Sequence, residues 1–171
     1  MTHARKQLIG HALIYPVKGA NLGVHAFDFG YEDQDGKLWW CLRGDMTDYH
    51  SIPTWAVPLT GPRTAFPIPS FLHDSAYAHQ QYSRVEADKM FREVLGICGA
   101  NRLHRNTFYR AVRLGGGRAW RDQNPFDTFR TDLLPDYILR RHSYAMIPDR
   151  YLKRLAKYRN ERREWRESLR S

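Results

Sequence analysis

The sequence has few cysteines and no long apolar segment. Cys41 and Cys98 are the only cysteines among 171 residues, too few for a disulfide framework and not spaced as a pair of metal ligands. No apolar run approaches the roughly 18 residues that a membrane-spanning helix needs. The N-terminal segment is basic, but its short apolar run is broken by Pro16 and precedes no small-residue cleavage site. We therefore expect a protein without a secretory signal, synthesised in a reducing cytoplasm.

The sequence also lacks internal repeats and a phosphate-binding glycine loop. The stretch "RLGGGRAW" from Arg113 to Trp120 holds three successive glycines, but it has neither the spacing of a P-loop nor a following Lys-Ser/Thr pair. We interpret these glycines as the end of a helix and assign them no chemistry.

The composition predicts a folded protein with an uneven positive charge. Hydrophobic residues make up 42% of the chain and aromatic residues 13%, which is typical of a globular domain. The formal net charge is +9. From Arg150 to Ser171, nine Lys or Arg stand against three Glu, so this segment supplies six of the nine net charges (nine minus three). The rest of the chain is only mildly basic.

The local patterns predict an α+β protein. Residues 1–50 contain short runs rich in β-branched and aromatic residues, and "DQDGK" is a turn of the Asp-Gly type that predicts a hairpin over about 27–42. Five prolines make residues 51–69 an irregular connector. Residues 70–117 have helical spacing. We treat 1–134 as one domain and 135–171 as a basic helical extension.

Four helices are expected. The first starts at Pro69 and Ser70, and a second, antiparallel to it, starts at "SRVE" (Ser83–Glu86), which is a capping box. A third helix, over about 103–114, should stop at the three glycines, and the segment from 121 to 138 should be irregular. The charged helix at the end of the chain should run over about 148–169.

The segment with the most suggestive chemistry surrounds His73. On a helix, His73 and Tyr77 share a face because they are four residues apart, whereas Asp74 points to a neighbouring face. Asp88 begins the next helix, so it can approach the His73 ring. A carboxylate bonded to one imidazole nitrogen leaves the other nitrogen free to accept a proton. Asp74 remains available for a hard cation such as Ca²⁺.

Each of these residues also has a plainer interpretation. Adjacent His and Asp residues on a helix most often lie in solvent without a chemical role, and a tyrosine such as Tyr77 is more often packed in the core than part of a catalytic site. The pattern His73-Asp74-x-x-Tyr77 is, however, followed by Ala87-Asp88-x-x-Phe91. The combination of these two spacings favours the catalytic interpretation.

This pattern resembles the phospholipase A2 superfamily, and in particular its small disulfide-free form in parvovirus capsid proteins. The resemblance implies that His73 activates water, Asp74 binds calcium, Asp88 orients His73, and Tyr77 supports the dyad. That superfamily completes its calcium shell with a glycine-rich loop, whereas "LTGPRT" here contains only one glycine, Gly61. The segment between this loop and the histidine is also shorter than in the viral enzymes. The short loop between the two helices also departs from that family.

Asp48, in the element "TDYHSIP", is an alternative calcium ligand that could rebuild such a site. It could equally form a local turn with Ser51 that leads the chain into Pro53, which is the commoner role of these residue types. Both interpretations of Asp48 stay open.

A second resemblance covers more of the chain. "GDMTDYHSIP", "FLHDSAY", "RVEADKMF" and "YRAVRLGG" follow one another between Gly44 and Gly117, and this order resembles a domain-of-unknown-function family common in tailed bacteriophages. The resemblance implies a phage origin, and we expect synthesis in the host cytoplasm, with the virion as an alternative final location. We therefore expect either a calcium-dependent phospholipase A2-like hydrolase at the host envelope or a non-enzymatic virion or tail component.

A different enzyme class, the HD phosphohydrolases, also uses His-Asp doublets as metal ligands. His50 would be the upstream ligand, and Asp122 or Asp127 the downstream one. Those enzymes are all-helical, so the β-rich start of this chain argues against them.

The C-terminal segment carries an approximate apolar and aromatic stripe that includes Tyr151, Leu155, Tyr158 and Trp165. The plainer interpretation is that this stripe docks on its own domain or on a neighbouring subunit. The alternatives are that the segment Arg150–Arg170 contacts nucleic acid, an anionic phospholipid membrane, or phage structural proteins.

Overall fold

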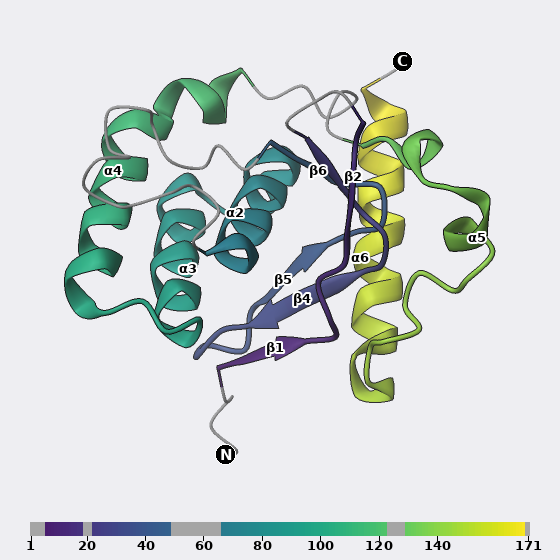
Figure 1. The fold of residues 1–171 in the computed structure, drawn as a ribbon, viewed down its shortest axis with the longest axis horizontal. Coiled ribbons are helices and arrows are strands. Elements are labelled where there is room, and N and C mark those ends of the chain that lie inside the picture. The colour runs from purple at the N-terminus through teal and green to yellow at the C-terminus, as the bar shows by residue number, and fades with distance from the viewer. Residues whose placement is uncertain (1–5, 19–21, 49–65, 123–128, 170–171) are drawn as a thin grey trace.

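The computed structural model describes residues 6–18, 22–48, 66–122 and 129–169, and the structural statements below concern these residues. Two small antiparallel sheets are followed by helices, which confirms the α+β class (Figure 1). The strands are β1 (Gln7–Ile9), β2 (Ile14–Pro16), β3 (Gly23–His25), β4 (Phe29–Glu32), β5 (Leu38–Cys41) and β6 (Met46–Thr47). The helices are α2 (Pro67–His79), α3 (Arg84–Ile97), α4 (Arg102–Arg121), a 3-10 helix (Thr131–Leu133), α5 (Asp136–Leu139) and α6 (Asp149–Ser168).

The strands form one sheet in the order β1-β4-β5 and another in the order β2-β3-β6. The predicted hairpin is confirmed as β4 and β5, which pair antiparallel. Its turn is held by Asp33, whose Oδ1 accepts the backbone N–H groups of Asp35 and Lys37, both at 2.9 Å. Gly36 supplies the left-handed backbone conformation there, with φ of 74°, which a residue without Cβ adopts at little cost.

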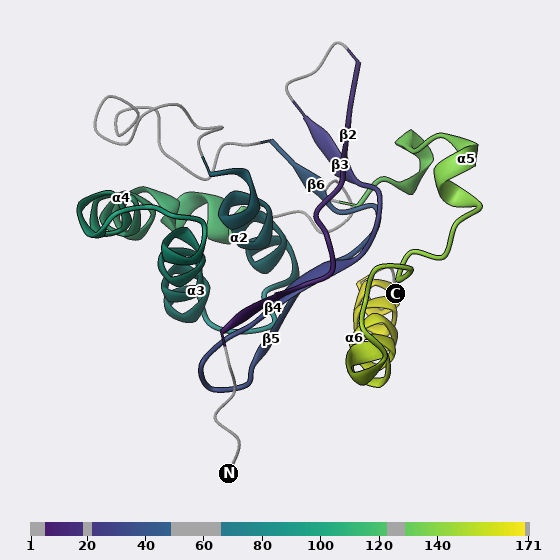
Figure 2. The same ribbon diagram turned by 60° about the horizontal axis from the view of Figure 1, so that its bottom comes forward.

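The sheet β1-β4-β5 lies between two helical layers (Figures 1 and 2). Because side chains alternate along a strand, Trp39 and Cys41 pack toward α2 and α3. Leu38 and Trp40 point to the other side, toward α6. The run "LWWC" is therefore buried at all four positions, because helices cover both faces of the sheet.

The capping box is confirmed at the start of α3. Ser83 accepts from the backbone N–H of Glu86, and the Glu86 carboxylate accepts from the backbone N–H of Ser83 at 3.0 Å. The first predicted helix is also present, although it begins at Pro67, two residues before the expected start.

The prediction that the third helix stops at the glycines is wrong. Helix α4 continues through all three glycines to Arg121. The reason is tertiary: a Cβ atom at Gly116 would lie 2.5 Å from the Tyr77 hydroxyl, so a small residue allows α4 to pack against α2. Trp120 then packs edge-on against the Tyr77 ring, with 5.0 Å between centroids. These contacts offset the roughly 1 kcal/mol that each helical glycine costs relative to alanine.

Helix α6 docks on its own domain, as the plainer interpretation of its stripe predicted. Tyr151, Leu155 and Tyr158 are buried against the outer face of the sheet β1-β4-β5. The division of the chain at residue 134 stays a prediction. The segment expected to be irregular, 121–138, contains the 3-10 helix and α5 among its described residues, so that expectation is wrong there. No helix in the described part of the chain is both long and apolar enough to cross a membrane.

Candidate functional site

Helices α2, α3 and α4 place four side chains around the carboxylate of Asp88. His73 Nε2 and the Tyr77 hydroxyl each lie 2.8 Å from Asp88 Oδ1. On the other carboxylate oxygen, Arg113 donates to Oδ2 at 2.7 Å, and Arg84 Nε lies 3.5 Å away. The structure thus brings together the three residues predicted to be catalytic, His73, Tyr77 and Asp88.

The two arginines were not foreseen. Arg84 precedes Asp88 by four residues, so helical spacing alone indicates this pair. Arg113 lies 25 residues after Asp88, and nothing in the local sequence indicates that contact. Arg84 also donates to the backbone carbonyl of Arg113, which links α3 to α4.

The surroundings determine the protonation of the dyad. Burial alone would raise the pKa of Asp88, but hydrogen bonds from His73, Arg113 and Tyr77 lower it below its ordinary value. Burial lowers the pKa of His73, against the opposing effect of Asp88. An ionised carboxylate only accepts hydrogen bonds, so the neutral His73 ring carries its proton on Nε2. The Nδ1 atom is then the basic one, and no hydrogen bond to it is formed among the described residues.

The His73 ring is held tightly in place. Its centroid lies 4.2 Å from that of Tyr77 and 4.8 Å from that of Phe91, and the residue is 2% exposed. A fixed tautomer and a fixed ring orientation are what a general base requires. The same burial, with every oxygen of Asp88 bonded, also suits a structural pair, because buried ionised groups are normally paired.

Asp74, the predicted calcium ligand, points away from this network. Its Oδ2 accepts a hydrogen bond from Thr47 Oγ1 of β6 at 2.6 Å. Asp48 directly follows that strand and is exposed. Gly61 lies outside the described residues. The carboxylate and hydroxyl at this point are hard oxygen donors of the kind that Ca²⁺ binds. Among the described residues, however, no three His, Cys, Asp or Glu side chains gather closely enough to hold a metal ion.

The ligands that an HD phosphohydrolase would need are not assembled in the described part of the chain. Asp122 is exposed at the end of α4 and is bonded to Arg118 at 3.1 Å. His50 and Asp127 lie outside the described residues.

A second buried His-Asp pair lies at the other end of α2. His79 Nε2 is 2.8 Å from Asp45 Oδ2, and Arg166 Nη2 of α6 is 3.9 Å from Asp45 Oδ1. Beside this pair, His25 is fully buried between the rings of Phe29 and Phe71. Neither ring nitrogen of His25 has a hydrogen-bond partner among the described residues.

Acidification between pH 6.5 and 4 is expected to destabilise the protein through His25. Burial lowers the pKa of His25 from 6.5 to about 4, opposed by Asp45 and assisted by His79. In this range the unfolded chain takes up a proton that the folded chain does not, so stability falls as the pH falls. At about 1.4 kcal/mol per pKa unit, the loss is roughly 3 kcal/mol.

Urea unfolding at several pH values measures this loss. A His25→Leu variant should have a clearly flatter pH dependence, because the proton-binding group is gone. His73, whose pKa is also lowered, contributes equally to both proteins. An unchanged slope in the variant would assign the acid sensitivity to other groups.

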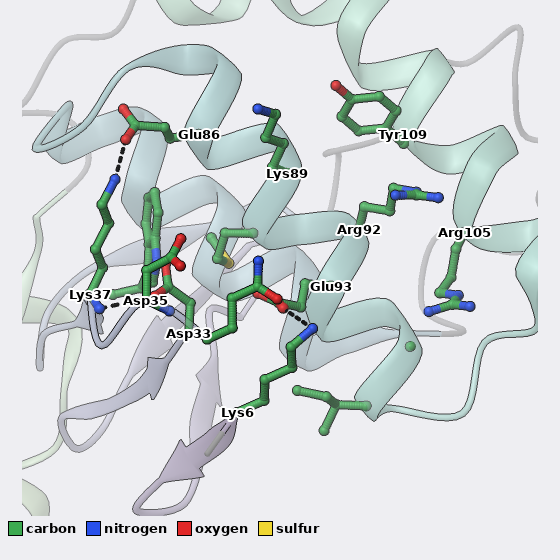
Figure 3. Close-up of a pocket in the computed structure, with 15 residues that line it drawn as sticks. Lys6, Asp33, Asp35, Lys37, Glu86, Lys89, Arg92, Glu93, Arg105 and Tyr109 are labelled. Atoms are coloured by element: carbon green, nitrogen blue, oxygen red, sulfur yellow. Dashed lines mark hydrogen bonds and ion pairs between the residues drawn. The ribbon is translucent and has the colours of Figure 1, made fainter. Parts of the chain in front are cut away.

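The cavity shown in Figure 3 lies away from the dyad of His73 and Asp88. It has a volume of about 740 Å³ and is bordered by the β4–β5 turn, α3 and α4. At its edges Lys37 pairs with Glu86, and Lys6 pairs with Glu93. Neither His73, Asp74 nor Asp88 lines it.

Comparison with curated proteins gives no match, and neither does comparison with solved structures. Comparison with protein families gives one result: residues 25–112 match the family DUF1353, described as a protein of unknown function. The matched segment runs from the end of β3 into α4, so it includes the β4–β5 hairpin and the dyad of His73 and Asp88. It covers 88 of the 171 residues (112 minus 24), more than half of the chain. The protein therefore belongs to the DUF1353 family.

Proposed function

We propose that this protein is a phage-encoded hydrolase of phospholipid esters, of the phospholipase A2 type, which acts at the host envelope. His73 is the general base, Asp88 orients it, and Tyr77 supports the pair by donating to the same carboxylate oxygen. The resemblance of "HDSAY" and "ADKMF" to that superfamily motivates the assignment.

The observation that carries the proposal is the 2.8 Å contact between His73 Nε2 and Asp88 Oδ1. It leaves Nδ1 as the basic nitrogen of a neutral imidazole. A water molecule bonded to Nδ1 would lose its proton to the ring as its oxygen attacks the ester carbonyl. The ring would then carry a positive charge, which the adjacent carboxylate of Asp88 stabilises. As the ester C–O bond breaks, the ring would return this proton to the oxygen of the leaving lysophospholipid, which regenerates the neutral base and releases the fatty acid.

Calcium is part of this proposal, with Asp74 as the ligand next to the base. When bound, the ion would stabilise negative charge on the ester oxygen. The hydrogen bond from Thr47 helps to hold the Asp74 carboxylate at this position. Asp48 and Gly61 are the further calcium ligands predicted from the sequence.

The test is fatty-acid release from mixed phospholipid vesicles by the purified full-length protein, with calcium and with excess chelator. Release that requires calcium, and that falls at least about tenfold in an Asp74→Asn variant, is the expected result. Release that continues in chelator would contradict the calcium assignment. A well-folded protein without activity above background, at any calcium concentration, would contradict the proposal that the protein is a phospholipid hydrolase.

A second candidate is a non-enzymatic virion or tail component. The burial of His73, at 2% exposure, together with the four partners of Asp88, favours it, because a satisfied core pair would have this form. In this case the dyad fastens α2, α3 and α4 together, and the protein functions through its surfaces.

A further inference from the structure

Helix α4 has the most one-sided charge of the described helices. Its twenty residues include six arginines and no acidic residue. Helix α6, which the sequence marks as the basic element, has eight Lys or Arg but also four Asp or Glu over the same length. The net charge of α4 is thus +6 (six minus zero), and that of α6 is +4 (eight minus four).

The two sides of α4 differ sharply. Phe108, Ala111 and Val112 are buried on its inner side, in the cluster that packs α4 against α3. On the outer side, Leu103 is 74% exposed and Leu114 is 78% exposed, the two highest values for large apolar residues in the described part of the chain. Covering such leucines with an apolar partner is favourable, at about 25 cal/mol per Å² of apolar surface removed from water.

Two arginines share a line with these leucines. Four residues lie along one side of the helix: Leu103, Arg110, Leu114 and Arg121. Their spacings are 7, 4 and 7 residues, and at 100° per residue each step ends within about 40° of the direction in which it began. Arg110 and Arg121 are exposed, as is Arg102 beside the stripe. We call these five residues the outer face of α4.

The outer-face arginines are available to a partner. Arg102, Arg110 and Arg121 form no ion pair within the described residues, whereas Arg118, next to the stripe, is bonded to Asp122. On α6, by contrast, two arginines pair with carboxylates of the preceding part of the chain: Arg159 with Asp28, and Arg154 with Glu32. Part of the positive charge of α6 is thus neutralised within the domain, and a contact of the C-terminal segment with a partner stays a prediction.

We propose that the outer face of α4 docks on an anionic phospholipid bilayer. The arginines would contact lipid phosphates, and Leu103 and Leu114 would enter the boundary between headgroups and acyl chains. A nucleic acid would satisfy the arginines but not the leucines, and the stripe has no aromatic side chain on which bases could stack. This surface would serve the proposed hydrolase, but the inference depends on α4 alone.

The experiment is flotation of the full-length protein with vesicles of neutral lipid, or of neutral lipid mixed with anionic lipid. We expect binding to the anionic vesicles only. Each arginine near such a surface contributes about 1 kcal/mol, or roughly fivefold in affinity. Replacing Arg102, Arg110 and Arg121 together by glutamine should therefore weaken binding on the order of 100-fold. Replacing Leu103 and Leu114 together by glutamine should weaken it roughly tenfold.

The matched control removes three exposed charges from α6, by replacing Lys153, Lys157 and Arg163 with glutamine. This variant has the same net charge as the triple α4 variant, and we expect no more than about a threefold loss, because screening limits long-range attraction. An equal loss in the two variants would overturn the proposal, since binding would then depend on net charge alone. Unchanged binding in the leucine variant would overturn it as well.

A duplex DNA fragment serves as the second probe. DNA binding that requires the α4 arginines, without any binding to anionic vesicles, would assign this face to nucleic acid and overturn the lipid proposal. Flotation does not depend on hydrolysis. Failure here therefore leaves the proposed activity untouched, and an inactive protein that still binds through α4 leaves this proposal standing.

Discussion

Phospholipid hydrolysis is expected to fall by about 10²–10⁴-fold when His73 is replaced by glutamine, the usual cost of removing a general base. Glutamine has no basic nitrogen, but its amide nitrogen reaches the position of His73 Nε2 and can still donate a hydrogen bond to Asp88. The variant therefore separates the catalytic role of His73 from its role in packing. The rate is measured as fatty-acid release from the same vesicles that serve for the wild-type protein.

The fold of this variant is checked by its thermal unfolding and circular dichroism. A Tyr77→Phe variant is the matched control, since it removes a donor to the same Asp88 oxygen but leaves the base in place. It should keep most of the activity, with a loss of about tenfold or less, because one supporting hydrogen bond contributes roughly 0.5–1.5 kcal/mol. Full activity in a folded His73→Gln protein would remove His73 from the mechanism.

Replacing Asp88 by alanine is expected to lower the free energy of unfolding by about 3–5 kcal/mol, the usual result when one partner of a buried ion pair is removed. Asp88 is completely buried, and the substitution leaves three donors, His73, Tyr77 and Arg113, without their acceptor. It also leaves Arg84 without its ion-pair partner. Since these four residues come from three helices, the loss should loosen α2, α3 and α4 together. Urea unfolding, followed by tryptophan fluorescence, measures the change.

The chain contains a close control for this experiment. Arg118 and Asp122 form an ion pair with the same four-residue spacing as Arg84 and Asp88, but at the surface of α4. Asp122→Ala should change the free energy of unfolding by no more than about 0.5 kcal/mol. Equal and small effects of the two substitutions would contradict the central role that the structure gives to Asp88.

Local patterns predicted several elements of the fold because the forces involved act within a few residues. The β4–β5 hairpin follows from an Asp-Gly turn between two apolar runs, and the start of α3 follows from Ser83 and Glu86 in a capping box. Both depend on hydrogen bonds that form close along the chain. Where distant packing decides, local patterns were wrong: α4 passes through its three glycines because Gly116 contacts Tyr77 of α2.

The candidate site divides in the same way. The helical period alone places His73 and Tyr77 on one face, and the short loop to α3 brings Asp88 within reach. Arg113 could not be predicted, because its contact with Asp88 depends on how α4 crosses the other two helices. The environment of His25, between two phenylalanine rings from a strand and a helix, is likewise a product of packing.

The sequence by itself determined that this protein is an α+β domain with a His-Asp motif on a helix and a basic C-terminal segment. Those properties depend on residue type and on spacings of a few residues. Only the tertiary structure decided that helices bury both faces of the sheet β1-β4-β5, and that Arg154 and Arg159 of α6 pair with Glu32 and Asp28 while Arg113 of α4 pairs with Asp88. The reason is physical: a charge is neutralised by whichever groups the fold brings within about 4 Å of it, and most of those are distant in the sequence.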